Sequence, residues 1–300
     1  MLKISNMATI SPELETNLKK SFTEAMKDEK FQRLISKLRI KEDVLIRYTS
    51  ELEDSAIEYD HCLHCKSLLE CQNKIEGYAY IPTCKGDHIE FNYRSCKYQE
   101  KMLKETSFLK NVYYVDIPEN IKIARMKDIY TDDKARYDVI KYLKKFINDP
   151  TTKGLYLHGN FGCGKTFLIT AAFNELARKN IKSAIIFWPS FLKKLKSSFD
   201  SDFSEIFEKV KKIPVLLIDD IGAENMTRWA RDEILCPILQ YRMEESLSTF
   251  FTSNLNINEL EVHLSLSKEG VDTVKAKRII SRIEQLTTDS EMISRNLRNK

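Results

Sequence analysis

The pattern of apolar and polar positions divides the chain into a helical part and an alternating part. Over the first sixty or so residues Leu, Ile, Lys and Glu predominate, and Leu34, Leu38 and Leu45 recur near helical spacing. Ser11-Pro12-Glu13 supplies a cap followed by proline at the first helical position. We therefore expect two or more helices here, whose apolar stripe is either a core face or a surface for a partner protein.

The second half of the chain alternates short apolar runs with helical stretches. Helices are expected over Asp132 to Asn148 and over Phe167 to Lys179. The predicted strands are Gly154 to His158, Ala184 to Trp188, Pro214 to Asp219 and Thr249 to Ser253. This alternation is typical of an α/β fold with a parallel sheet covered by helices on both faces.

A stretch of different character lies between these two parts. Residues 61–100 carry Cys, His and the alternating run Ile89, Phe91 and Tyr93, which predicts a small module with a hairpin. Residues 101–130 are predicted to be a linker. The predicted organisation is thus a helical, metal-binding domain over residues 1–100, a linker over 101–130 and a nucleotide-binding domain over 131–300.

Composition narrows the class of protein. The 300 residues, 42% of them hydrophobic, suffice for ordinary globular cores, and the net charge of +4 indicates that any contact with DNA comes from local patches. No apolar stretch reaches the roughly 18 residues that a membrane span needs, and the first residues lack the apolar centre of a signal peptide. We expect a cytoplasmic protein without membrane contact.

The most specific motif is GNFGCGKT, from Gly159 to Thr166, which fits the phosphate-loop pattern G-x-x-x-x-G-K-[ST]. Its glycines let the backbone aim N–H groups at phosphate oxygens, Lys165 can reach the β- and γ-phosphates, and Thr166 can hold Mg²⁺. The alternative is a degenerate loop that binds nothing. The residues expected to bind ATP are Gly159, Asn160, Phe161, Gly162, Cys163, Gly164, Lys165, Thr166 and Phe167.

Polar side chains at two later strand ends complete the predicted site. The run PVLLIDD brings Asp219 to the edge of the sheet, where it can hold Mg²⁺, and Asp220 can orient or deprotonate an attacking water. Asn254 either contacts the γ-phosphate or is an ordinary strand-ending turn residue. Arg278 and Arg282 share one helix face, where they either stabilise a transferring phosphoryl group or are simply solvated.

Five of the seven cysteines lie between Cys62 and Cys96. Because a cytosolic compartment keeps thiols reduced, this clustering favours a metal over disulfides. Cys62 and Cys65 form a CxxC pair, a turn that supplies two ligands to zinc. The second half of the cluster lacks such a pair, so a reduced cluster without metal is the alternative.

A basic stretch with interleaved aromatics follows the second predicted strand. Lys193, Lys194 and Lys196 lie near Trp188, Phe191 and Phe199. Such a stretch suits single-stranded DNA, because cations pair with phosphates while bases stack on rings. The alternative is an amphipathic helix with a lysine face and a buried aromatic face.

Five stretches carry a family resemblance: the phosphate loop, LLIDDIGAE, TRWARDEIL, TFFTSN and KAKRIISRI. In this order they resemble bacterial replicative-helicase loaders of the DnaI/DnaC type, which are AAA+ ATPases. The likeness covers residues 115–300 and is shared with transposition helper ATPases related to IstB. The N-terminal half with its cysteines resembles the DnaI type in particular.

The resemblance implies a role for each motif. Lys165 and Thr166 would belong to Walker A and Asp219 and Asp220 to Walker B, while Asn254 would be sensor 1, Arg278 the finger between subunits and Arg298 the late sensor arginine. The implied zinc ligands are Cys62, Cys65, Cys71 and Cys96, with Cys84 or His88 as the alternative fourth ligand. Asp220 stands where many AAA+ proteins have Glu, and its shorter side chain predicts slow hydrolysis.

The function implied by the resemblance is a loader that uses ATP and Mg²⁺. It would bind the replicative hexameric DNA helicase, associate with itself through the AAA+ domain and deliver the helicase onto single-stranded DNA at replication initiation or restart, as part of the primosome. One alternative is an IstB-like transposition helper ATPase. Another is an adaptor that binds ATP without hydrolysing it.

Overall fold

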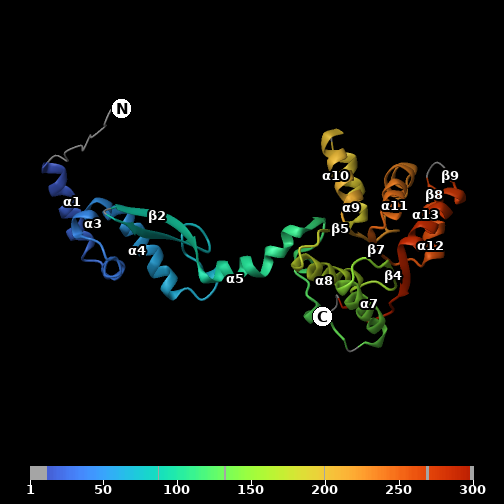
Figure 1. Ribbon diagram of the computed structural model, residues 1–300, viewed down its shortest axis with the longest axis horizontal. Helices are drawn as coiled ribbons and strands as arrows, with labels where there is room; N and C mark the ends of the chain where they lie inside the picture. The colour runs from blue at the N-terminus through green and yellow to red at the C-terminus, as the bar shows by residue number, and fades with distance from the viewer. Residues whose placement is uncertain (1–11, 87, 132, 199, 268–269, 298–300) are drawn as a thin grey trace. The chain divides into compact units, whose positions relative to one another are not determined.

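A computed structural model of the chain describes residues 12–297 except 87, 132, 199 and 268–269 (Figure 1). The chain forms two compact units, Met1–Glu105 and Thr106–Lys300. The predicted helix starts at Ser11 and Asp132 lie outside the described residues. None of the helices in the described ranges is long and apolar enough to span a membrane.

The first unit is a small helical domain with one β-hairpin. Its main elements are α1 (Pro12–Ala25), α2 (Glu29–Ile35), α3 (Glu42–Leu45), α4 (Thr49–His64), β1 (Tyr78–Lys85), β2 (His88–Ser95) and α5 (Lys97–Thr106). Apolar side chains of α1, α2, α3 with the turn that follows it, and α4 form the core, to which β2 adds Ile89. The antiparallel pairing of β1 with β2 confirms the predicted hairpin.

A buried carboxylate joins the hairpin to the helices. Glu58 of α4 is 3% exposed and accepts hydrogen bonds from the backbone N–H groups of Tyr80, at 2.7 Å, and Lys74, at 3.2 Å. Ser55, one turn earlier, donates its hydroxyl to the carbonyl of Tyr80 at 2.7 Å. Since buried polar groups must be paired, these bonds fix β1 against α4.

The second unit is built on a six-stranded parallel sheet in the order β10-β4-β7-β6-β5-β3. Its strands are β3 (Val112–Val115), β4 (Gly154–His158), β5 (Ser183–Phe187), β6 (Val215–Asp219), β7 (Ser248–Ser253) and β10 (Thr287–Glu291). The four predicted strands match β4 to β7 to within one residue at each end, which confirms the predicted parallel sheet. The sequence pattern does not predict the edge strands, because β10 is polar and β3, although apolar, has only four residues.

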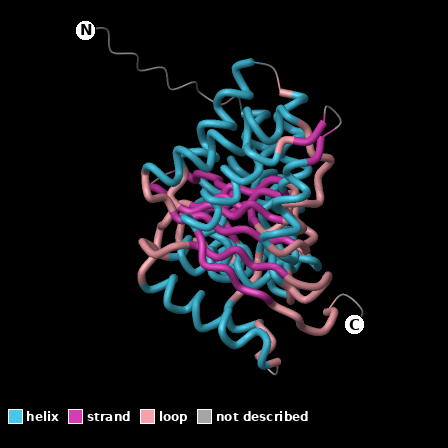
Figure 2. Tube along the Cα trace, turned by 90° about the vertical axis from the view of Figure 1, so that its right-hand side faces the viewer, coloured by secondary structure: helices cyan, strands magenta, loops and turns pink. Residues whose placement is uncertain are grey.

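Helices cover both faces of this sheet, as predicted (Figure 2). On one face lie α7 (Tyr137–Asn148) and α8 (Lys165–Arg178); on the other lie α9 (Trp188–Ser197), α10 (Asp200–Lys212), α11 (Cys236–Glu244), α12 (Ile257–Ser265) and α13 (Thr273–Leu286). Successive strand residues alternate between the two cores: Leu216 and Ile218 join one, and Val215 and Leu217 the other. Both faces are therefore apolar, as buried parallel strands require.

Residues 106–130 differ from the expected linker. β3 pairs with β5 at the edge of the sheet, and the side chains of Phe108, Val112, Ile117 and Ile129 are buried in the core beside α8. The boundary between the units follows Glu105 instead. A strand of four residues is too short to show a periodic pattern, and its partner β5 is distant in sequence. The sequence pattern of this segment therefore predicts a connector.

The remaining elements are short. They are α6 (Glu119–Lys122), 3₁₀ turns at Ile46–Tyr48, Leu68–Glu70, Ser107–Asn111, Met126–Asp128 and Lys134–Arg136, a π-helix at Trp229–Leu235, and the strand pair β8 (Leu266–Ser267) and β9 (Gly270–Val271).

Because all six strands of the sheet run parallel, β4, β6 and β7 end at one edge. The polar residues that follow these strands therefore meet there.

Candidate functional site

The loop after β4 turns sharply into α8. Gly159 has a φ of 144°, and a Cβ there would lie 2.1 Å from the carbonyl oxygen of Met292, so no larger residue fits. Gly164, with a φ of 91°, directly precedes the first residue of α8, which is Lys165. The loop thus ends at a helix N-terminus, where backbone N–H groups and the helix dipole favour an anion.

Lys165 connects this loop to the end of β7. Its side-chain nitrogen donates to the carbonyl oxygens of Gly159, at 2.9 Å, and Asn160, at 3.0 Å, and to Oδ1 of Asn254, at 2.8 Å. The residue is only 8% exposed. The ammonium group is therefore held at the meeting point of β4, α8 and β7.

The two carboxylates that follow β6 have different partners. Oδ1 of Asp219 accepts the hydroxyls of Thr166, at 2.7 Å, and Thr252, at 2.6 Å. Asp220 accepts Nδ2 of Asn254 at 3.0 Å. Asn254 thus bridges Lys165 and Asp220, and the two residues expected to hold Mg²⁺, Thr166 and Asp219, lie within hydrogen-bonding distance of each other. Their hard oxygen donors are of the kind that Mg²⁺ prefers.

Burial makes the Asp219 carboxylate hard to ionise. The residue is 6% exposed, and burial raises its pKa to about 6, although the Thr252 and Thr166 hydroxyls act in the opposite direction. In the unfolded chain this carboxyl has its ordinary pKa, near 3.8. The folded state therefore binds more protons between these values, and it loses stability as the pH rises through this window.

Substitution of Asp219 by Asn should stabilise the nucleotide-free protein at pH 7.5. We expect a gain of up to about 3 kcal/mol in the free energy of unfolding, because the variant has no buried charge to form. The gain should shrink at pH 5, where wild-type Asp219 is largely protonated. Urea unfolding at both pH values measures this. The exposed carboxylate variant Glu233→Gln is the control, and a pH-independent loss of stability in Asp219→Asn would contradict the expectation.

A cavity of about 960 Å³ opens beside these residues. Of the predicted nucleotide-site residues, those that line it are Phe161, Gly162, Gly164, Lys165, Thr166, Phe167, Asp219, Asp220 and Asn254. Gly159 and Asn160 do not line it but hold Lys165 through their carbonyl groups, and Cys163 is completely buried behind the loop. The structure thus brings the phosphate-loop lysine and both carboxylates to one cavity.

Sequence reasoning missed one wall of this cavity. Part of the wall comes from the segment expected to be a linker, with Ile121, Ile123, Ala124 and Tyr130, and Arg136 and Leu297 also contribute. Arg136 is only 2% exposed, and its guanidinium lies close to Gly164. No motif or periodic pattern marks these residues, because they meet only through the fold.

The predicted arginines lie apart from the cavity or outside the described residues. Arg278 is exposed on α13 and does not line the cavity of its own chain. Arg282 donates to the sulfur of Cys236 at 2.8 Å. Arg298 lies outside the described residues.

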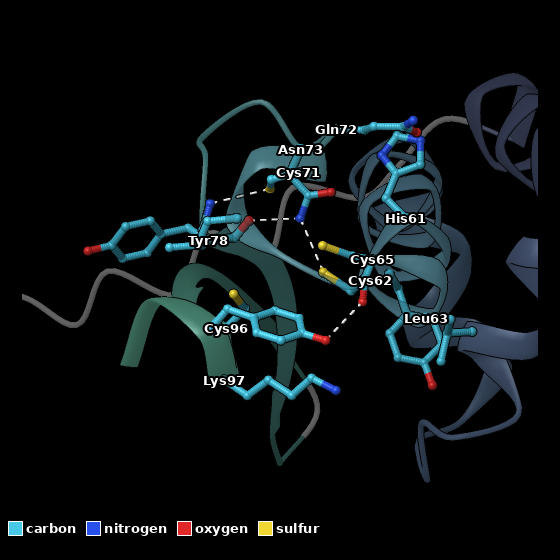
Figure 3. Close-up of a pocket in the computed structure, with 14 residues that line it drawn as sticks. His61, Cys62, Leu63, Cys65, Cys71, Gln72, Asn73, Tyr78, Cys96 and Lys97 are labelled. Carbon is cyan, nitrogen blue, oxygen red and sulfur yellow. Dashed lines mark hydrogen bonds between the residues drawn. The ribbon is translucent and has the colours of Figure 1, made fainter. Parts of the chain in front are cut away.

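The four predicted zinc-ligand cysteines line one cavity in the first unit, of about 310 Å³ (Figure 3). Three of their sulfurs accept N–H groups: Cys62 from Asn73 Nδ2 at 3.3 Å, Cys71 from the Gly77 backbone at 3.3 Å and Cys96 from the Gln99 backbone at 3.5 Å. Burial raises the pKa of the Cys62 thiol, and Cys96, Cys71 and Cys65 raise it further by charge repulsion. The four sulfurs are therefore near enough to interact.

As they stand, these side chains do not form a metal site. Among the described residues, no group of three or more Cys, His, Asp or Glu side chains is placed to hold a metal ion. The two alternative fourth ligands, Cys84 and His88, do not line the cavity. Cys84 is exposed near the end of β1, and His88 is exposed at the start of β2. His61, which was not assigned as a ligand, does line it.

The basic stretch forms an amphipathic helix with buried aromatics. Trp188 and Phe191 of α9 are completely buried, so they cannot stack on bases, and Phe199 lies outside the described residues. The lysines are exposed, and Lys193 and Lys196 line a third cavity, of about 250 Å³. The Lys196 ammonium lies 5.1 Å from the ring centroid of half-buried Trp229, an aromatic contact that the sequence pattern did not suggest.

Comparisons with known proteins agree with this geometry. Residues 129–299 match the family described as IstB-like ATP binding protein. The chain is 33% identical to the replicative helicase loader DnaI of Bacillus subtilis (strain 168) over 299 residues, which cover 96% of this chain and 95% of that protein. A crystal structure of DnaI superposes with a TM-score of 0.57 and 38% identity, covering 64% of this chain and 99% of that one. The chain therefore belongs to the family of DnaI-type replicative helicase loaders, whose ATP-binding part is an AAA+ domain.

Proposed function

We propose that this protein is an ATP-dependent loader that binds the replicative hexameric DNA helicase and delivers it onto single-stranded DNA at replication initiation or restart. The observation that carries the proposal is the similarity to the loader DnaI along 96% of the chain. That match includes the first unit, whereas the match to the IstB-like family begins at residue 129. A transposition helper would explain the second unit alone.

The geometry of the nucleotide site supports ATP as the nucleotide that this protein binds and hydrolyses. Lys165 lies where it can exchange its carbonyl partners for phosphate oxygens, and bound Mg²⁺, held through Thr166 and Asp219, would neutralise phosphate charge. Asp220 would orient or deprotonate the attacking water, with Asn254 keeping its carboxylate in place. The short Asp220 side chain supports slow hydrolysis, suited to a switch.

Phosphate release that rises with single-stranded DNA would exclude a non-hydrolysing adaptor.

Self-association through the second unit would complete the site. Arg278 is exposed and does not line its own cavity, so it is available to a γ-phosphate bound by a neighbouring subunit. ATP would then join subunits by placing this guanidinium against the next nucleotide. Hydrolysis would weaken the contact and favour release of the helicase.

Single-stranded DNA would bind along α9. The exposed face of this helix carries Lys193, Lys194 and Lys196, and Trp229 beside Lys196 offers an aromatic ring for a base. Trp229 begins the π-helix, which follows Asp219 and Asp220 in the chain with only a short segment between. This closeness in sequence would let DNA contact influence the carboxylates.

Removal of the α9 charges should weaken DNA binding in a salt-dependent manner. In a plot of log affinity against log salt concentration, the slope is negative. For Lys193→Ala/Lys196→Ala we expect it to become less negative by about 1.4, at about 0.7 per lost contact to a single strand. Trp229→Ala should weaken the free energy of DNA binding by about 1–3 kcal/mol, with little change in that slope. Fluorescence anisotropy with labelled oligothymidine measures both. The control, Lys141→Ala/Lys144→Ala, removes two exposed lysines of α7, and an equal loss in that variant would rule out the α9 surface.

Zinc would stabilise the first unit through Cys62, Cys65, Cys71 and Cys96. All four line one cavity, and N–H bonds to three of the sulfurs are of the kind that supports thiolate ligands. Binding would require the thiols to turn toward a common centre. Nothing in this arrangement calls for a catalytic metal, so the zinc would be structural.

Selective capture of a partner tests the loader function. Immobilised protein with ATP should retain purified replicative helicase from the same organism, whereas a transposase partner of IstB-like ATPases should pass through. The isolated second unit, residues 106–300, should lose the helicase if the first unit makes the contact. Retention of the transposase and not the helicase would refute the proposal.

A further inference from the structure

The segment after β10, residues 292–297, lies against the phosphate loop. The backbone N–H of Met292 donates to the carbonyl of His158 at 2.8 Å, and that of Leu297 donates to the carbonyl of Gly162 at 2.9 Å. Met292 and Ser294 are 0% and 7% exposed. The segment is therefore docked on the loop by its backbone and by alternate side chains.

Asn160 and Ser294 form a reciprocal pair at the centre of this contact. Nδ2 of Asn160 donates to the carbonyl of Ser294 at 2.6 Å, and the N–H of Ser294 donates to Oδ1 of Asn160 at 3.0 Å. The Ser294 hydroxyl also donates to Asp133. Asn160 occupies a variable position of the motif and does not line the nucleotide cavity. Its side chain therefore contacts the segment and not the cavity.

The pair bears directly on the lysine that would contact phosphate. The main-chain carbonyls of Gly159 and Asn160, together with Oδ1 of Asn254, hold the Lys165 ammonium, so a change in the orientation of Asn160 alters the surroundings of Lys165. At its far end the same segment contributes Leu297 to the cavity wall. The Arg295 guanidinium lies 5.8 Å from the ring centroid of Tyr130, which lines the cavity as well.

We propose that residues 292–297 position the phosphate loop through the Asn160–Ser294 pair, so that nucleotide binding and docking of this segment stabilise each other. The proposal rests on the proposed nucleotide binding and adds a positioning residue to it. A nucleotide that contacts a wall present only when the segment is docked binds the docked state more tightly. By linkage the nucleotide then favours docking to the same extent.

The variant Asn160→Ala separates this role from the motif itself, because G-x-x-x-x-G-K-[ST] accepts Ala at that position. We expect its affinity for ADP and for a non-hydrolysable ATP analogue to fall about tenfold, the effect of losing two hydrogen bonds that orient the loop. Isothermal titration measures this. Asn148→Ala, an exposed amide at the end of α7, is the matched control and should bind as wild type.

Hydrogen exchange gives an independent measurement on the wild-type protein. ADP should slow exchange at the amides of Ser294 and Leu297, and should do so less in Asn160→Ala at equal site occupancy. Unchanged exchange on ADP binding, or wild-type affinity in a folded Asn160→Ala, would overturn the coupling while leaving nucleotide binding intact. If the wild-type protein bound no nucleotide, the proposed function would fail and this inference with it.

Discussion

Lys165→Ala should lower the affinity for ATP by about 100-fold, because charged hydrogen bonds to phosphate contribute about 1.5–3 kcal/mol each. Lys165 is the ammonium group that the fold holds between the phosphate loop and Asn254, at 2.8–3.0 Å from three oxygens. Alanine leaves the glycine backbone in place but supplies no charge. Titration with a fluorescent ATP analogue measures the loss.

The same variant tests whether ATP controls delivery of the helicase. ATP hydrolysis should fall below detection, and helicase deposited on single-stranded DNA, measured by gel shift, should fall with it. Lys182→Ala removes an exposed lysine of the same unit and should match wild type in all three measurements. If Lys165→Ala deposited helicase normally, the ATP switch would be dispensable.

Under the proposed zinc binding, a chelator should destabilise the first unit and leave the second unchanged. A structural zinc contributes on the order of 10 kcal/mol or more to the folding of a small module. The module around the cysteine cavity, with its one hairpin and short turns, has few apolar residues of its own to replace that contribution. Calorimetry with a strong chelator should show one unfolding transition at a lower temperature, whereas ATP affinity should stay within about twofold because the units have separate cores.

The cysteines themselves provide the matched comparison. Cys62→Ser should lower the zinc content, measured by mass spectrometry, and destabilise the first unit. Cys84→Ser should do neither, because Cys84 is exposed on the hairpin and does not line the cavity. A wild-type protein that carries no zinc, or equal effects of the two variants, would favour a reduced cluster without metal.

The sheet and the phosphate site could be predicted because their signals are local. GNFGCGKT is contiguous, and its flanking strand and helix are predicted by their own apolar pattern. Asp219, Asp220 and Asn254 could be assigned to the same edge because parallel strands end together. The structure confirms that edge, with Asn254 between Lys165 and Asp220.

For α9, the burial of its side chains distinguishes between the two interpretations that the sequence allows. The lysines and aromatics of α9 fitted both a DNA surface and an ordinary amphipathic helix. In the fold Trp188 and Phe191 are core residues, so among the described residues of the predicted pattern only the lysines remain available to a ligand. The aromatic ring beside them, Trp229, comes from another element.

By itself, the sequence determined the class of fold, the phosphate loop and the position of Asp219 and Asp220 at the end of a strand, since each depends on neighbours along the chain. Only the tertiary structure decided the cavity wall at Ile121 and Tyr130, the burial of Arg136 and the docking of residues 292–297 on the loop. These contacts join segments far apart in sequence, and they arise when the edge strands β3 and β10 pair with the sheet. The polar strand β10 and the four-residue strand β3 are specified by their partners and not by their own pattern.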